Sequence, residues 1–373
     1  MTSPAEGHTS PEFEPVRQAF EALLRDDSGY SGQLAVYWRD RLVVDLTGGP
    51  ELAPDSVIGV HSATKGVAAL CLALLVQRGQ LDLDKPVCHY WPEFGRHGKQ
   101  DISVRQLLSH QAGLLGTADG LSTEDFCSRR AAELLADERP VWRPGSGFGY
   151  HRRTIGALME ELTLRATGRT LQELYAAEIR DPREVDFYLG LPASEEHRFV
   201  PTRYAPAPHV MPPAGHPGSL WALALGKEDR IPPNIERLRR YGPVANGGVG
   251  SARGLARAYA CATEDVGGER LLTPQTVATF AQQQVFGTCL VTQRRSGYGI
   301  VFERPHPDDA YASFQALGHR GANGSLGYAD PMFRVAVGFV RQPGVVGGMA
   351  PEVRTLTTLI RECAIAAEAG ASS

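Results

Sequence analysis

Residues 62–77 read SATKGVAALCLALLVQ, and this stretch decides the fold prediction. Its apolar side chains recur at the spacing of a helix, and Gly79 follows where a helix would end. The stretch therefore predicts a helix that begins at or near Ser62. Backbone N–H groups at a helix start point outward and favour a developing negative charge, so a reactive Ser62 would be well placed there.

Ser62 and Lys65 form a Ser-x-x-Lys pattern. Residues three apart share one face of a helix, so the Lys65 amine can reach the Ser62 hydroxyl. Free lysine, with a pKa of about 10.4, is a poor base near neutrality, but burial and nearby cations lower that value. A pattern with only two fixed positions also arises by chance, so its interpretation as a catalytic motif depends on the surrounding sequence. Only four of the 38 basic residues are lysines, which makes a lysine at this place more informative.

A second element is the Gly-rich turn PGSGFGY at residues 144–150, which ends at Tyr150 just before an amphipathic pattern. A phenol beside a lysine can move protons between a nucleophile and a leaving group. Read alone, Tyr150 is better explained as a packing residue at the end of a loop.

A third element is GHRGA at residues 318–322, at the end of an expected strand. Its glycines permit close approach of a substrate, and an exposed N–H there can complete an oxyanion hole. A simple tight turn explains the same residues about equally well.

The remaining pattern predicts an α+β fold. A hairpin is expected from 33–37 and 42–46, helices at 104–108, 154–166, 171–179 and 252–263, strands at 297–302, 313–319, 325–329 and 335–340, and a last helix at 351–367. The loop 205–217 carries five prolines and should lack regular structure. We predict a sheet subdomain from 12–85 and 240–373, with a mostly helical insertion at 86–239.

Composition excludes several classes of function. The formal net charge is −4, which leaves no excess of positive charge for nucleic acid or an anionic membrane. The longest apolar stretch is too short to span a bilayer, and no secretory signal is visible. Six scattered cysteines fit reduced thiols, so we expect a cytoplasmic protein without metal or cofactor. Oligomeric state is not readable from the sequence.

Other hydrolase and nucleotide motifs are missing. No serine has glycine both two residues before and two residues after it, as an α/β-hydrolase elbow requires. No His-Glu-x-x-His run or cysteine pair points to a metal site. The Gly-rich segments 246–250 and 344–348 do not open helices after strands, so we interpret them as turns.

In this order, the three elements resemble the motifs of the class C β-lactamase superfamily over roughly residues 12–367. The segment VRQLLSHQAGL at 104–114 resembles another signature of that superfamily, in which His110 would be structural. The Tyr150-His151 pair and the His319-x-Gly321 element are more similar to family VIII carboxylesterases than to true β-lactamases. The resemblance implies a β-lactamase-like fold, with an antiparallel sheet flanked by helices and a mostly helical second subdomain.

The resemblance also implies roles for individual residues. Ser62 would be the acylated nucleophile, and Lys65 and Tyr150 the proton-transfer pair. The backbone N–H groups of Ser62 and Ala322 would form the oxyanion hole. His319, Gly321 and Arg152 would line the substrate site.

Two departures from the β-lactamase pattern favour ester chemistry. Arg152 stands where those enzymes usually have an asparagine, and His319 stands where they have a lysine that binds a carboxylate. We expect a serine hydrolase that acts on small esters, with amide hydrolysis as a weaker option. Two alternatives stay open: an acyltransferase that passes the acyl group to an amine or alcohol, and a catalytically silent binding protein.

Overall fold

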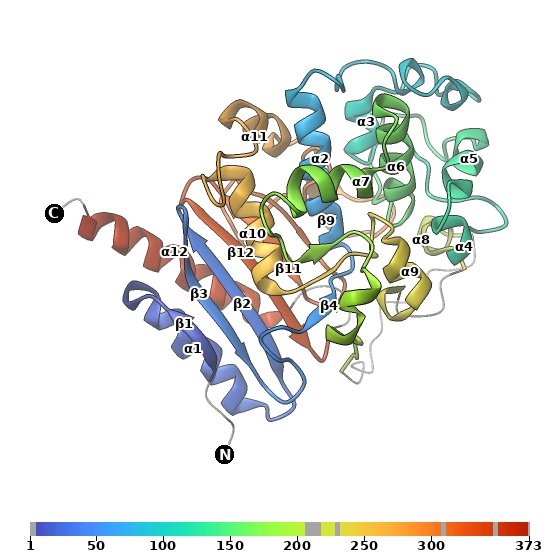
Figure 1. Cartoon of the computed structure of the whole chain (residues 1–373). Coiled ribbons are helices and arrows are strands. Elements are labelled where there is room, and N and C mark those ends of the chain that lie inside the picture. The colour runs from blue at the N-terminus through green and yellow to red at the C-terminus, as the bar shows by residue number, and fades with distance from the viewer. Residues whose placement is uncertain (1–4, 206–217, 228–231, 307–310, 346–349, 372–373) are drawn as a thin grey trace.

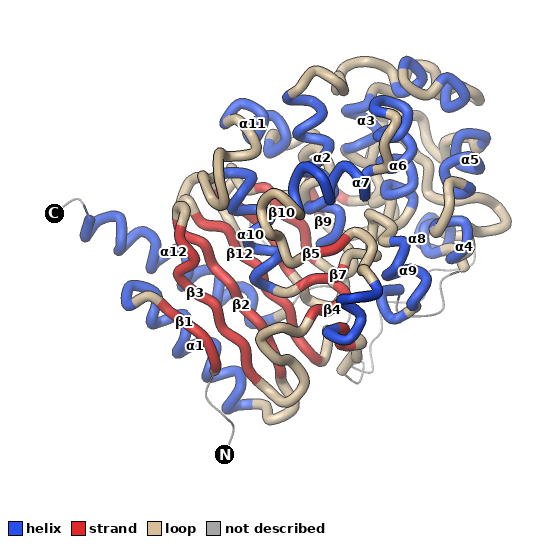
Figure 2. The backbone as a smooth tube through the Cα atoms, in the orientation of Figure 1, coloured by secondary structure: helices blue, strands red, loops and turns tan. Residues whose placement is uncertain are grey.

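The computed structural model describes residues 5–205, 218–227, 232–306, 311–345 and 350–371. A six-stranded antiparallel sheet runs through it in the order β1-β3-β2-β12-β11-β10 (Figure 2). Its strands are β1 (Glu6–Thr9), β2 (Ser31–Trp38), β3 (Arg41–Gly48), β10 (Leu317–Arg320), β11 (Leu326–Asp330) and β12 (Val335–Gln342). Strands from the two ends of the chain thus meet in one sheet, at the β2–β12 pair.

The two faces of the sheet bury different helices, because successive side chains of a strand point to opposite faces. Leu34, Val36 and Trp38 of β2 belong to one apolar cluster, which includes side chains of α1 (Glu14–Asp26) and α12 (Pro351–Ala371). The intervening residues of β2 belong to the main core, which includes α10 (Ala252–Thr263). Figure 1 shows α10 in front of the sheet, with α1 and α12 behind it.

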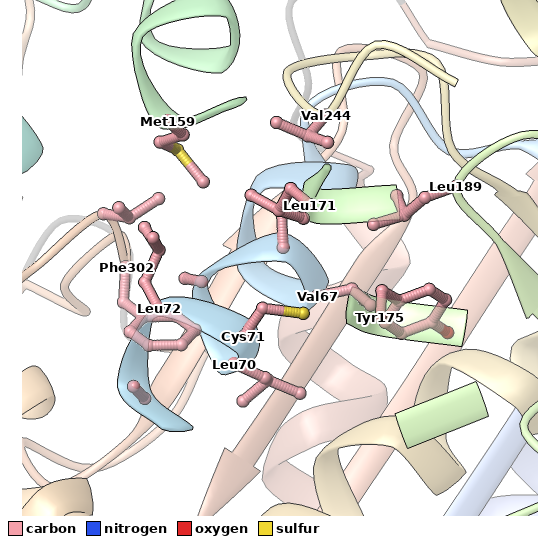
Figure 3. Close-up of a cluster of buried hydrophobic side chains, with 14 of the residues drawn as sticks. Val67, Leu70, Cys71, Leu72, Met159, Leu171, Tyr175, Leu189, Val244 and Phe302 are labelled. Carbon is pink, nitrogen blue, oxygen red and sulfur yellow. The ribbon is translucent and has the colours of Figure 1, made fainter. Parts of the chain in front are cut away.

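Helix α2 (Ala63–Gln77) lies inside the main core, and its residues 63–75 are all buried. A helix that is apolar on every side must be covered on every side. Figure 3 shows Val67, Cys71 and Leu72 of α2 with Met159, Leu171 and Val244 from other segments. The core thereby holds the helix that begins after Ser62.

Further helices and two small sheets complete the fold. The other α-helices are α3 (Val104–Leu108), α4 (Thr123–Phe126), α5 (Arg130–Asp137), α6 (Thr154–Thr167), α7 (Leu171–Tyr175), α8 (Leu220–Leu225), α9 (Glu236–Tyr241) and α11 (Pro274–Ala281). Short helical turns span Pro11–Phe13, Val87–His89, Pro92–Gly95, Ala176–Arg180, Ala193–Arg198 and Pro232–Asn234. A small sheet has the order β5-β7-β4-β6, from β4 (Val57–Gly59), β5 (Phe187–Tyr188), β6 (Phe199–Val200) and β7 (Val249–Gly250), and β8 (Val285–Thr288) pairs with β9 (Arg295–Tyr298).

The α+β, β-lactamase-like fold class is confirmed, as are the early hairpin and the helices expected at 104–108 and 252–263. The division at residues 86 and 240 stays a prediction. Strands β5 and β6 of the expected helical insertion pair with β7 and β4 of the expected sheet part. Residues 206–217 of the Pro-rich loop, and most of the segment 344–348, lie outside the described residues.

Two expected strands have wrong bounds. β9 ends at Tyr298 instead of continuing to 302, because Val301 has a φ of 66° and its N–H donates to Leu108 outside any strand. β10 begins at Leu317 instead of 313, because the N–H and hydroxyl of Ser313 both bind the Asp330 carboxylate and form a turn.

Candidate active site

Ser62 directly precedes the first residue of α2 and is half-buried. Lys65, one turn later, is fully buried, and its Nζ donates a hydrogen bond to Ser62 Oγ at 3.1 Å. The distance is what the three-residue spacing on a helix predicts. The structure therefore places the expected nucleophile and the expected base in contact.

Tyr150 meets the same oxygen from a different part of the chain. Its Oη donates to Ser62 Oγ at 2.8 Å. Its backbone N–H donates to the buried Cys289 Sγ at 3.2 Å, and its ring stacks on Tyr298 with centroids 5.9 Å apart. Burial raises the pKa of Tyr150, and the hydrogen bond to Ser62 acts in the opposite direction. These contacts fix a phenol beside the serine hydroxyl.

A third contact of the site was missed by sequence reasoning. Lys65 Nζ also donates to the backbone carbonyl of Ala245 at 2.6 Å. Ala245 precedes the Gly-rich segment 246–250, for which the sequence predicts only a turn. A carbonyl acceptor carries no side-chain signal, so no residue pattern could have revealed it.

The segment 321–323 packs against the residues that precede Ser62. A side chain at Gly321 would collide with the Val60 carbonyl at 2.2 Å, and Asn323 Nδ2 donates to the Gly59 carbonyl at 3.0 Å. Glycine at 321 is therefore required by close approach. Ala322 lies in an exposed turn after β10, and the backbone N–H groups of Ser62 and Ala322 have no acceptor within the described residues. Both N–H groups are thus available for an oxyanion.

His319 lies on β10 beside Tyr150. It is 3% exposed, and its ring centroid lies 6.1 Å from that of Tyr150. Nδ1 contacts the Arg320 carbonyl at 2.8 Å. Burial lowers the pKa of His319 to about 4, so the imidazole is neutral near pH 7. It therefore does not supply the permanent positive charge of a lysine at that position.

The next residue on β10, Arg320, is held by a carboxylate. Its Nε donates to Glu303 Oε2 at 3.0 Å, and a second contact joins Nη2 to Oε1. Burial raises the pKa of Glu303, but the charge of Arg320 and its hydrogen bonds together outweigh burial, and the pKa falls to about 2. The pair is therefore ionised and largely self-neutralising.

Arg152 is half-buried and follows Tyr150 by two residues. Burial is the largest influence on two nearby groups: it lowers the pKa of His61 and raises the pKa of Tyr150. The positive charge of Arg152 lowers the pKa of both groups by a smaller amount. His61, just before Ser62, is buried with a pKa of about 3, and its Nε2 lies 3.3 Å from Tyr204 Oη. A role for Arg152 in substrate binding stays a prediction.

Two histidines support the turn that carries Tyr150. His110 Nδ1 accepts from the His151 N–H at 3.2 Å, and the His110 carbonyl accepts from the Gly149 N–H at 3.0 Å. His151 uses both ring nitrogens on backbone groups, the Gly149 carbonyl at 2.7 Å and the Leu114 N–H at 3.0 Å. Their bonds to the backbone fit the supporting role expected for His110.

The described ranges contain no group of three or more His, Cys, Asp or Glu side chains that could hold a metal ion. None of the helices in these ranges is both long and apolar enough to cross a membrane.

Comparison with known proteins connects this geometry to named relatives. Residues 16–343 match the family model described as Beta-lactamase. The chain is 30% identical over 370 residues to the esterase/beta-lactamase LipL of Mycobacterium tuberculosis H37Rv, an alignment that covers 90% of this chain and 82% of LipL.

Two solved structures are similar over almost their whole length. EstA from Arthrobacter nitroguajacolicus Rue61a superposes with a TM-score of 0.93 at 44% identity, covering 97% of this chain and 99% of EstA. A family VIII carboxylesterase superposes with a TM-score of 0.86 at 28% identity, covering 96% and 99%. The similarity to esterases expected from Tyr150-His151 and His319-x-Gly321 thus extends to the whole fold.

Proposed function

Because the chain belongs to the Beta-lactamase family, we propose that it hydrolyses small carboxylic esters through an acyl-enzyme on Ser62. One observation carries the proposal: Ser62 Oγ accepts hydrogen bonds from both Lys65 Nζ and Tyr150 Oη. The names of the relatives, LipL, EstA and a family VIII carboxylesterase, support ester substrates.

The geometry suggests how the reaction proceeds. The Ser62 hydroxyl proton passes to Lys65, the neutral amine of the Lys65–Tyr150 pair, as Ser62 Oγ attacks the ester carbonyl. The negative charge that develops on the carbonyl oxygen is stabilised by the N–H groups of Ser62 and Ala322. The alcohol leaves with a proton from the Lys65–Tyr150 pair, and water then hydrolyses the acyl-enzyme.

His319 and the Arg320–Glu303 pair support a neutral substrate. The imidazole is uncharged near pH 7, and the guanidinium is bound by the half-buried carboxylate of Glu303. A neutral ester has no carboxylate that a cation must bind. The lysine expected at this place in β-lactamases provides a cation that binds the carboxylate of their substrate. We propose that Gly321 and His319 form the wall of the ester site on this side.

Turnover of p-nitrophenyl acetate tests the proposal. We expect steady release of p-nitrophenol by the purified chain, loss of that release in Ser62→Ala, and no stimulation by an added amine or alcohol. Release that requires the added acceptor would instead indicate an acyltransferase. No release from any activated ester tried would favour the silent binding protein.

We further propose a cytoplasmic location. All six cysteines are free in the structure, and five of them are buried, as fits a reducing compartment. Cell fractionation with an antibody to the chain tests this location, and recovery in the extracellular fraction would contradict it.

A further inference from the structure

The carbonyl of Ala245 holds Lys65, and its position depends on the loop 242–248. Ala245 lies 180 residues from Lys65 in the chain. Its carbonyl can therefore meet Nζ only if the loop itself is fixed. Three of the contacts that fix this loop matter here: two come from α6 and one comes from α2.

The first contact comes from Glu160 on α6. Its Oε1 accepts the backbone N–H of Val244 at 2.8 Å, the residue directly before Ala245. Its Oε2 accepts the hydroxyl of Tyr241 at 3.4 Å. One half-buried carboxylate thus ties α6 to the start of the loop.

The other two contacts fix the middle and the end of the loop. Helix α6 packs directly on Ala245, since a side chain at Gly156 would meet the Ala245 nitrogen and Cβ at 2.7 Å. Gly248 N–H donates to Thr64 Oγ1 at 3.0 Å. Val244 itself is buried in the main core with Met159 and Leu171 (Figure 3). Among these contacts, only the one from Glu160 joins a side-chain carboxylate to the residue next to Ala245.

We propose that Glu160 is a positioning residue for proton transfer, because it fixes the Ala245 carbonyl that holds Lys65 Nζ against Ser62. Burial raises the pKa of Glu160 to about 7, and its ionised form accepts a stronger hydrogen bond from an N–H than a neutral carboxyl group does. Loss of the carboxylate frees the Val244 N–H and lets the carbonyl and the amine shift together. A displacement of about 1 Å at a reacting group costs up to about a hundredfold in rate. The inference rests on the proposed ester hydrolysis at Ser62.

Two substitutions at Glu160 separate positioning from bulk packing. Glu160→Ala removes the acceptor, and we expect kcat for p-nitrophenyl acetate to fall by about tenfold to a hundredfold with little change in KM. Glu160→Gln keeps a side-chain oxygen for the Val244 N–H, and we expect it to recover most of the lost kcat.

Glu161 provides a matched control on the same helix. Its carboxylate is buried and binds Arg129 and Arg165, and neither partner belongs to the loop 242–248. Glu161→Gln should lower the melting temperature, because it weakens two ion pairs. It should leave kcat within about twofold, because the loop 242–248 keeps its contacts and no reacting group is displaced.

The outcomes are distinct. A folded Glu160→Ala variant with unchanged kcat, or an equal loss of kcat in Glu161→Gln, overturns the positioning role while the ester hydrolysis stands. A wild-type chain that releases no p-nitrophenol and forms no adduct on Ser62 overturns both.

Discussion

Two hydrogen-bond donors from distant parts of the chain share one acceptor, Ser62 Oγ. Lys65 reaches it along a helix turn, and Tyr150 reaches it from a loop 88 residues later. A lysine amine can release and take up a proton at working pH, but an arginine cannot. The identity of residue 65 is therefore a direct test of proton transfer.

We expect Lys65→Arg to reduce kcat/KM for an activated ester nearly as much as Ser62→Ala. Lys99→Arg is the matched control, because Lys99 is also buried and its Nζ also donates to a backbone carbonyl, that of Glu138 at 2.6 Å. The pair should differ by at least about a hundredfold in the rate of p-nitrophenol release. A Lys65→Arg enzyme that keeps most of its activity would remove Lys65 from the mechanism.

Tyr150→Phe removes the second donor to Ser62 while keeping the ring. We expect the rate of acylation, followed by stopped flow, to fall by about two to four orders of magnitude, the usual range for acid-base assistance. Tyr298→Phe keeps the stacked ring beside it and should leave the rate within a fewfold of wild type. Near-normal acylation in Tyr150→Phe would reduce that residue to packing.

The first turn of α2 is bound to the loop 242–248 by a threonine. Thr64 Oγ1 donates to the His61 carbonyl at 2.5 Å and accepts the Gly248 N–H at 3.0 Å. Thr64 is fully buried, so these backbone groups have no access to bulk water. The Thr64 hydroxyl thus connects the helix to the loop, in addition to the hydrogen bond from Lys65 Nζ to the Ala245 carbonyl.

Thr64→Val keeps the shape of the side chain but leaves the Gly248 N–H without an acceptor. We expect a loss of about 1–3 kcal/mol in the free energy of unfolding, measured by urea denaturation. Thr64→Ser keeps the hydroxyl and should lose less. Equal losses in the two variants would assign the effect to packing of the methyl group.

Local elements could be predicted from the sequence where their pattern is strong. The apolar run after Ser62 predicts α2 because every face of that helix is buried, and α10 matches its expected bounds of 252–263. The strands at 297–302 and 313–319 were misplaced because a positive φ at Val301 and the Ser313–Asp330 hydrogen bonds interrupt them. Neither interruption leaves a signal in the local pattern of apolar residues.

The arrangement of the whole molecule depends on contacts between segments far apart in the sequence. Ser62, Lys65 and Tyr150 could be predicted because side chains and spacing mark them. The Ala245 carbonyl and the Tyr298 ring could not be predicted as parts of the site. Ala245 contributes only a backbone group, and Tyr298 contributes only packing against Tyr150.

Several histidines are buried in the neutral form, and this should make stability depend on pH. Burial lowers the pKa to about 3 for His61 and to about 4 for His151 and His319, against about 6.5 in the unfolded chain. Below pH 6.5 the unfolded state binds protons that the folded state does not, so their contribution to stability is present above pH 6.5. It is lost as the pH falls toward 4.

We therefore expect the melting temperature to fall between pH 7 and pH 5, with each histidine costing about 1–2 kcal/mol over that range. His319→Gln removes one such group and should flatten the pH dependence of unfolding. An unchanged slope in that variant would mean that His319 is not buried in its neutral form.

Intact-mass spectrometry during turnover of a p-nitrophenyl ester tests the central claim most directly. We predict that rapid acid quenching of the wild-type chain traps one acyl group, that peptide mapping places it on Ser62, and that Ser62→Ala carries none. An acyl group found on another residue, or an equal amount on Ser62→Ala, would contradict the account.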